Sequence, residues 1–182
     1  MRVLAGKEYV LHILFVCTGN ICRSPTAERV AAAYADRAQI PNFIASSAGI
    51  RAVIAHPIHR DAATVLESLG GDASDFAARQ LKPRIMSAAD LILTMTTAHR
   101  DAALEIAPQK LHRTFTLSEA AQLVSAHGAT TVADLPALRP QLTARELFDI
   151  PDPIGQDPEV FASVGAQIAG LLPPILELCR TP

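Results

Sequence analysis

The chain has 182 residues, of which 49% are hydrophobic and 4% aromatic, so we expect one aliphatic core of ordinary domain size. A formal net charge of −2 without a basic run argues against a nucleic-acid-binding or membrane-surface protein. Three cysteines are too few for a disulfide framework and favour a reducing, cytoplasmic location. No apolar run approaches the ~20 residues that span a bilayer, so no membrane insertion is expected.

The first elements are predicted from apolar runs and helix-start signals. Residues 1–8 form an N-terminal extension, and residues 9–182 form a single domain. Residues 10–16 are almost continuously apolar, as expected of a central parallel strand that is covered on both faces. Ser24 and Pro25 then predict a helix, with the serine as N-cap and the proline in the first turn.

Further strands are predicted at residues 43–47, 89–95 and 113–117. Further helices are predicted at residues 58–69, 97–106 and 118–126, and from Asp157 onward until Pro173 and Pro174 end or kink the last one. Residues 72–83, 127–146 and 148–157 are predicted loops, the second with room for a helical turn. This alternation predicts a three-layer, Rossmann-like α/β fold with a central four-stranded parallel sheet flanked by helices.

The stretch from Cys17 to Ser24 follows the first strand, and ligands of such sheets bind beyond the carboxyl ends of the strands. A thiol attacks as its thiolate, which the start of a helix and a nearby guanidinium, here Arg23, both stabilise. The guanidinium can also hold two phosphate oxygens. Ser24 is close enough in sequence to hydrogen-bond the Cys17 sulfur.

Backbone N–H groups of a loop that leads into a helix converge on an anion. Gly19 and Asn20 are the residue types that most readily adopt the dihedral angles this requires. The predicted phosphate-binding residues are Thr18, Gly19, Asn20, Ile21, Cys22 and Arg23.

Two other readings of these residues are weaker. A zinc site would need four ligands, and Cys17 and Cys22 leave only Cys179 as a further thiolate. A nucleotide-binding P-loop would need the pattern G-x-x-x-x-G-K-[ST], which the chain lacks. No metal or other cofactor is therefore expected.

The sequence VCTGNICRSP at 16–25 resembles the signature of the low-molecular-weight protein tyrosine phosphatases. The resemblance extends over residues 10–172, because further segments occur in the order and rough spacing of that family. These are SSAG at 46–49, AARQL at 77–81, ADLILTM at 89–95 and IPDPIG at 150–155.

The resemblance implies a protein-tyrosine phosphatase with a cysteinyl-phosphate intermediate. Cys17 would be the nucleophile and Arg23 the phosphate clamp. Asp152 would protonate the departing phenolate and then act as base toward water. By the same resemblance, Asn20 and Ser47 would support the loop, and Cys22 would form a reversible disulfide with the nucleophile.

The partner implied by this resemblance is a phosphotyrosine-containing protein, for example a bacterial tyrosine kinase, and a monomer is expected.

Two positions depart from the family pattern. Ile154 stands where many members have an aromatic wall of the substrate slot, and Phe76 stands where many have a histidine.

Three alternative functions have less support in the sequence. Arsenate reduction on the same fold would need two further cysteines in the middle of the chain, and none lies between Cys22 and Cys179. A non-catalytic phosphotyrosine-binding module is disfavoured because Cys17, Arg23 and Asp152 are all retained. Hydrolysis of small phosphomonoesters stays open, because Ile154 and residues 127–146 can reshape the entrance.

Overall fold

The computed structural model describes residues 10–180, so the predicted extension at 1–8 lies outside the described residues. Four parallel strands form one sheet in the order β2-β1-β3-β4, which confirms the predicted fold class. The strands are β1 (Leu11–Cys17), β2 (Phe43–Gly49), β3 (Leu91–Thr94) and β4 (Thr114–Thr116). The helices are α1 (Arg23–Arg37), α2 (Arg60–Ser68), α3 (Pro83–Ser87), α4 (Thr97–Ile106), α5 (Leu117–Ser125), α6 (Leu135–Leu138) and α7 (Pro158–Glu177).

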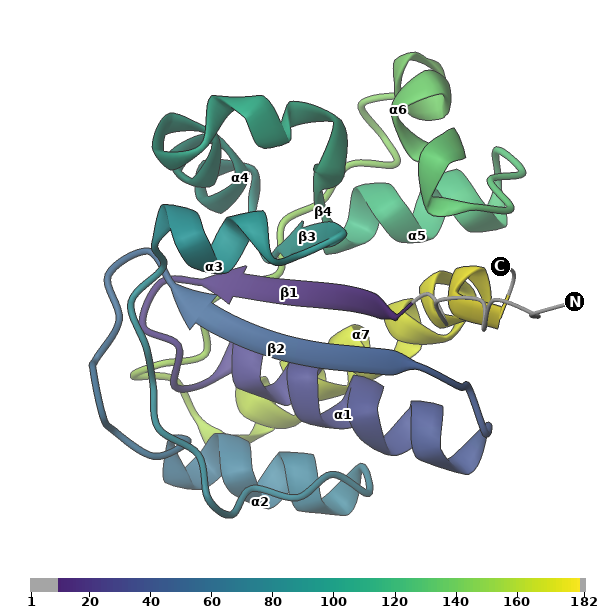
Figure 1. The fold of residues 1–182 in the computed structure, drawn as a ribbon. Helices are drawn as coiled ribbons and strands as arrows, with labels where there is room; N and C mark the ends of the chain where they lie inside the picture. Colours follow the sequence, from purple (N-terminus) through teal and green to yellow (C-terminus); the bar gives the residue numbers. More distant parts are fainter. Residues whose placement is uncertain (1–9, 181–182) are drawn as a thin grey trace, which may run out of the picture.

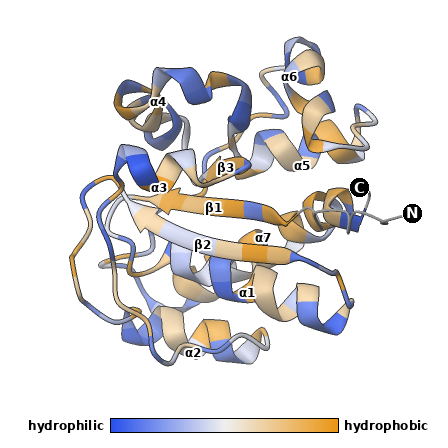
Figure 2. Ribbon diagram, viewed as in Figure 1, coloured by the Kyte–Doolittle hydropathy of each residue, from blue (hydrophilic) through white to orange (hydrophobic). Residues whose placement is uncertain are grey.

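Strand β1 is the centre of the core and is hydrophobic along most of its length (Figure 2). Its side chains alternate between the two faces of the sheet. Ile13 and Phe15 pack in the larger cluster, to which α1, α5 and α7 contribute. Leu14 and Val16 pack in the smaller cluster, with α3 and α4 (Figure 1). Burial on both faces explains the continuous apolar run, and it leaves Cys17 at the carboxyl end of a rigid strand.

The start of α1 differs from the prediction. Cys22, and not Ser24, occupies the N-cap position, and Ser24 lies within the first turn of the helix. The Ser24 hydroxyl contacts the Cys17 sulfur and the Asn20 amide. These contacts take the place of the capping hydrogen bond that was expected of Ser24. Helix α3 is an additional element that was not predicted, because it is short and Met86 is its one buried residue.

The C-terminal helix does not end at Pro173 and Pro174, which was one of the two predicted effects of these prolines, because α7 continues through both to Glu177. Beyond the prolines, Ile175 and Leu176 are completely buried, and their burial offsets the lost backbone hydrogen bonds. Asp157 does occupy the N-cap position, but its side chain makes no capping hydrogen bond.

By length and composition alone, the helical segment Pro158–Arg180 could cross a membrane, with a mean hydropathy of 1.4. This was not expected from the sequence. In the structure α7 packs against α1, α2 and α5, and its apolar side chains form a large part of the core. We therefore interpret it as the core helix of the domain.

Candidate active site

The peptide carbonyls of the loop between β1 and α1 point away from the centre of the loop. Five of them accept backbone N–H groups from outside the loop at 2.7–3.1 Å. The acceptor–donor pairs are Cys17 with Ile50, Thr18 with Arg51, Gly19 with Val53, Ile21 with His59, and Cys22 with Thr26. Because the C=O and N–H of a trans peptide point in opposite directions, the N–H groups that follow these carbonyls face inward. This arrangement forms an anion-binding concavity at the N-terminus of α1.

Asn20 holds this loop in shape from behind. Its backbone has φ = 55°, a left-handed conformation that asparagine tolerates better than most residues. The completely buried amide donates to the hydroxyls of Ser24 and Ser47, both at 2.9 Å. Its carbonyl oxygen accepts the N–H of Arg79 at 2.9 Å. All these groups are satisfied, so the loop, β2 and the Arg79 segment form one rigid unit.

Gly49, at the end of β2, allows this close approach. A Cβ atom at this position would lie 2.5 Å from the carbonyl oxygen of Thr18 and 3.0 Å from the amide nitrogen of Asn20. Both neighbours are backbone atoms, which cannot move without distorting the loop. The SSAG segment therefore ends in glycine for a steric reason.

A pocket of about 210 Å³ opens above the loop. The Cys17 sulfur lies 3.0 Å from the Ser24 hydroxyl, and the residue is only 2% exposed. Burial, followed by the charge of Cys17, raises the pKa of Cys22 to about 12, so Cys22 remains a thiol near neutral pH. The pocket is lined by Cys17, Thr18, Gly19, Ile21, Cys22, Arg23, Arg51, Val53, Asp152 and Ile154.

Arg23 and Asp152 meet in this pocket although they are far apart in the sequence. The buried Arg23 guanidinium donates to the carbonyl oxygen of Ile150 and pairs with the Asp152 carboxylate, each at 3.0 Å. The Asp152 side chain is half exposed, and its second oxygen accepts the N–H of Ile154 at 3.2 Å. This local turn leaves the carboxylate at the mouth of the pocket.

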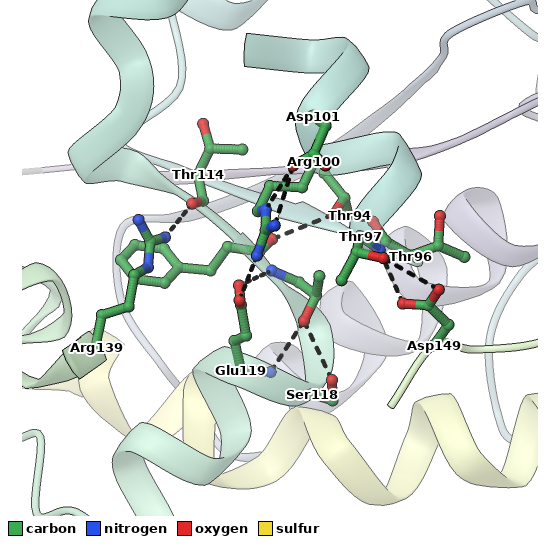
Figure 3. A network of polar contacts seen from close by, with 12 residues as sticks. Thr94, Thr96, Thr97, Arg100, Asp101, Thr114, Ser118, Glu119, Arg139 and Asp149 are labelled. Carbon is green, nitrogen blue, oxygen red and sulfur yellow. Dashed lines mark hydrogen bonds and ion pairs between the residues drawn. The ribbon is translucent and has the colours of Figure 1, made fainter. Parts of the chain in front are cut away.

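The loop that carries Asp152 has a defined course because three contacts anchor its beginning. The Ser118 hydroxyl donates to the carbonyl oxygen of Phe148 at 2.7 Å. The N–H of Thr97 donates to the Asp149 carboxylate at 2.8 Å, at the N-terminus of α4 (Figure 3). The N–H of Ile150 donates to the carbonyl oxygen of Met95 at 2.9 Å.

The two helices that supply these anchors are themselves joined by a buried charge network (Figure 3). The Glu119 side chain, 3% exposed, pairs with Arg100 of α4 at 2.5 Å. It also accepts the N–H of Thr116 at 2.7 Å, which completes a capping box at the start of α5. The network fixes α4 relative to α5, and so holds the Asp152 loop over the pocket.

The structure thus brings the predicted site residues together. Eight of them line the pocket, whereas Asn20, Ser24 and Ser47 lie behind the loop as a hydrogen-bonded support. Ile154 is 41% exposed at the mouth of the pocket, on the side of the Asp152 loop.

His99 contacts the loop that lines the site and was not identified from the sequence. Its Nε2 lies 2.8 Å from the Thr18 hydroxyl, whereas its buried Nδ1 has no hydrogen-bond partner among the described residues. Burial, together with the positive charge of Arg23, lowers the pKa of His99 to about 4. The imidazole is therefore neutral at physiological pH. Because the two residues are 81 positions apart, no local sequence pattern predicts their contact.

We expect His99 to make the stability of the protein sensitive to acid. Its pKa is about 4 in the folded state and 6.5 ordinarily, so the unfolded chain takes up the proton first as the pH falls. The neutral imidazole contributes fully to the stability of the folded protein above pH 6.5. This contribution decreases by up to about 3 kcal/mol as the pH falls toward 4.

Urea unfolding of the wild type and of His99→Gln at pH 7.5 and 4.5 measures this pH dependence of stability. The variant should lose less stability between the two pH values, and the exposed-site control His56→Gln should match the wild type. Equal losses in all three proteins would contradict the assignment.

Comparison with known proteins agrees with the site. The family model for low molecular weight phosphotyrosine protein phosphatases matches residues 12–178. The probable low molecular weight protein-tyrosine-phosphatase EpsP of Ralstonia nicotianae is 37% identical over 134 residues, which cover 74% of this chain and 83% of that protein. The protein-arginine-phosphatase of Geobacillus stearothermophilus is 32% identical over 169 residues, which cover 93% of this chain and 96% of that protein.

Solved structures show the same architecture. The crystal structure of a low molecular weight protein tyrosine phosphatase from T. tengcongensis is 30% identical and has a TM-score of 0.74, over 92% of this chain and 98% of that one. The family model extends from β1 to the end of the last helix and includes both the Cys17 loop and the Asp152 loop. The chain belongs to the low molecular weight phosphotyrosine protein phosphatase family.

Proposed function

We propose that this protein hydrolyses phosphotyrosine in other proteins, through a phosphorylated Cys17. One observation carries the proposal: a nucleophilic residue, a guanidinium and a ring of inward-facing N–H groups surround one pocket, with a carboxylate at its mouth. We further propose that the protein acts in the reducing cytoplasm as a monomer, on a phosphotyrosine-containing protein such as a bacterial tyrosine kinase.

In the first step, the Cys17 thiolate attacks phosphorus, an S–P bond forms, and the P–O bond to the tyrosine ring breaks. The Arg23 guanidinium and the loop N–H groups hold the three non-bridging oxygens, so the growing charge meets donors that are already oriented. Asp152 gives its proton to the departing phenolate oxygen.

In the second step, Asp152 takes a proton from water as the water oxygen attacks phosphorus, and the S–P bond breaks. The products are inorganic phosphate and the Cys17 thiolate. The Ser24 hydroxyl, 3.0 Å from the sulfur, stabilises the departing thiolate through a hydrogen bond. A phosphate dianion also competes with Asp152 for Arg23, so substrate binding frees the carboxylate from its ion pair.

A second candidate substrate is phosphoarginine, because the similarity to the arginine phosphatase covers more of this chain than the similarity to EpsP. The walls of the pocket favour phosphotyrosine. Ile21, Val53 and Ile154 offer apolar surface to a phenyl ring. A guanidine group would need hydrogen-bond acceptors, but Asp152 is the one carboxylate that lines the pocket among the residues that the structure describes, and Arg51 adds a positive charge.

Arsenate reduction remains disfavoured in the folded chain. Cys179, the third cysteine, lines a different pocket together with Leu11, at the opposite end of β1. The length of that strand places it about 20 Å from Cys17. A thiol relay between these two residues would need a large rearrangement of the core helix.

The test is a comparison of peptides of one sequence that carry phosphotyrosine, phosphoarginine or phosphoserine, assayed by phosphate release in the presence of EDTA. We expect kcat/KM for phosphotyrosine to exceed that for either other peptide by at least about tenfold. Vanadate should inhibit competitively, because it resembles the phosphoryl group in transfer. A preference for phosphoarginine would replace the proposed substrate, and dependence on an added metal ion would contradict the mechanism.

A further inference from the structure

A second pocket, of about 440 Å³, lies beside the phosphate pocket and is lined by positively charged side chains. We call it the basic pocket. It is formed by β1, by the segment that follows β2, by α3 and by the residues on either side of α3. Its lining residues are His12, Ile54, Arg79, Gln80, Lys82, Arg84, Ile85 and Ala88, and none of them is acidic.

The two pockets share a wall. Val53 lines the phosphate pocket, and its neighbour Ile54 lines the basic pocket, with consecutive Cα atoms only ~3.8 Å apart. The Gln80 side chain braces this wall, because it donates to the carbonyl oxygen of Ile50 at 2.7 Å and accepts the N–H of Ala52 at 3.0 Å. A ligand that spans both pockets would therefore cross a fixed surface.

The charges of the basic pocket are not neutralised within the part of the chain that the structure describes. No ion pair between residues 10 and 180 includes Arg79, Lys82 or Arg84, nor does one include Arg51 at the rim of the phosphate pocket. The Arg79 guanidinium donates to the carbonyl oxygen of Ser47, which is a neutral acceptor. This face is therefore locally positive, although the whole chain has a net charge of −2.

We propose that the basic pocket binds acidic side chains of the protein substrate, close in sequence to its phosphotyrosine. The inference rests on the proposed function of the neighbouring pocket. Charge complementarity selects the occupant, because Asp and Glu carboxylates match Lys82 and Arg84, and none of the described residues that line the pocket is acidic. Small aryl phosphates occupy the phosphate pocket alone and do not reach the second one.

The experiment uses the full chain and three phosphotyrosine peptides whose flanking residues are neutral, acidic or basic. The test variant is Lys82→Gln/Arg84→Gln, since both side chains are exposed. Arg79 is left intact, because its backbone and side chain support Asn20 and Ser47. The charge-matched control is Arg37→Gln/Arg145→Gln, two exposed residues that line neither pocket.

We expect the wild type to prefer the acidic peptide over the neutral one by about five- to tenfold in kcat/KM, as for two or three exposed ion pairs. Salt near 0.5 M should reduce this preference by screening. The test variant should lose most of the preference but keep wild-type rates on the neutral peptide and on p-nitrophenyl phosphate. The control variant should keep the preference.

An equal rate on all three peptides in the wild type would overturn the inference while leaving the proposed function intact. A preference that survives unchanged in the test variant would also overturn it. Failure of the wild type to hydrolyse any phosphotyrosine peptide would contradict the proposed function instead. Activity on p-nitrophenyl phosphate serves as the folding control in every case.

Discussion

Replacing Cys17 by serine is expected to lower the hydrolysis of phosphotyrosine peptides and of p-nitrophenyl phosphate by at least about 10⁴-fold. A serine hydroxyl is a much weaker nucleophile at neutral pH than a thiolate. The side chain that contacts the Cys17 sulfur is the Ser24 hydroxyl, which would not act as a base toward the new serine. Steady-state kinetics on the purified variant measure the loss.

The same variant separates binding from chemistry. The N–H groups and Arg23 are unchanged in Cys17→Ser, so inorganic phosphate should still bind, and calorimetry can measure its affinity. The matched control is Cys179→Ser, which removes a thiol at the opposite end of β1 and should leave the kinetics unchanged. Substantial activity in Cys17→Ser, with an unchanged unfolding temperature, would rule out the covalent mechanism.

The sheet and the phosphate loop could be predicted because their signals are local. The apolar run of β1 reflects burial on both faces, and the loop residues follow one another in eight consecutive positions. Asp152 was predicted to lie at the site only because IPDPIG at 150–155 matches the family. The ion pair between Asp152 and Arg23 agrees with that placement.

The missed features depend on contacts between distant segments. His99 contacts Thr18 over 81 positions, and Asp149 contacts Thr97 over 52, so neither pairing leaves a pattern within one element. Ser24 was misassigned as an N-cap for a different reason, because its hydroxyl contacts Cys17 and Asn20 of the preceding loop. The basic pocket likewise joins side chains from β1, the segment after β2 and α3, which only the folded chain brings together.

The prolines of α7 are a case in which the local sequence signal was strong but the prediction of a helix end was wrong, because tertiary packing stabilises the helix beyond them. Proline inside a helix costs about 3 kcal/mol or more. The burial of Ile175 and Leu176 beyond them yields about 1.5–3 kcal/mol each. These terms are of similar size, so sequence alone does not decide between a helix end and a continuous helix.

Replacing Asp152 by alanine is expected to slow the reaction according to how much its leaving group needs a proton. For phenyl phosphate, whose phenolate is a poor leaving group, kcat/KM should fall by about 10²- to 10³-fold. For 2,4-dinitrophenyl phosphate, whose phenolate leaves without protonation, the fall should be less than about tenfold. A series of aryl phosphates therefore gives a steep dependence of kcat/KM on the leaving-group pKa in the variant and a shallow one in the wild type.

The choice of kcat/KM matters because it reports the steps up to and including cleavage of the P–O bond. The value of kcat also includes hydrolysis of the cysteinyl phosphate, in which Asp152 acts as base and the leaving group is already gone. We therefore expect kcat in Asp152→Ala to fall to one value for all activated substrates, with a burst of phenol release in rapid-mixing experiments.

The matched control is Asp149→Asn in the same loop, where asparagine can still accept the Thr97 N–H. It should keep the shallow dependence. Equal losses for good and poor leaving groups in Asp152→Ala would show that its carboxylate does not protonate the phenolate, and would leave the ion pair with Arg23 as its role at the site.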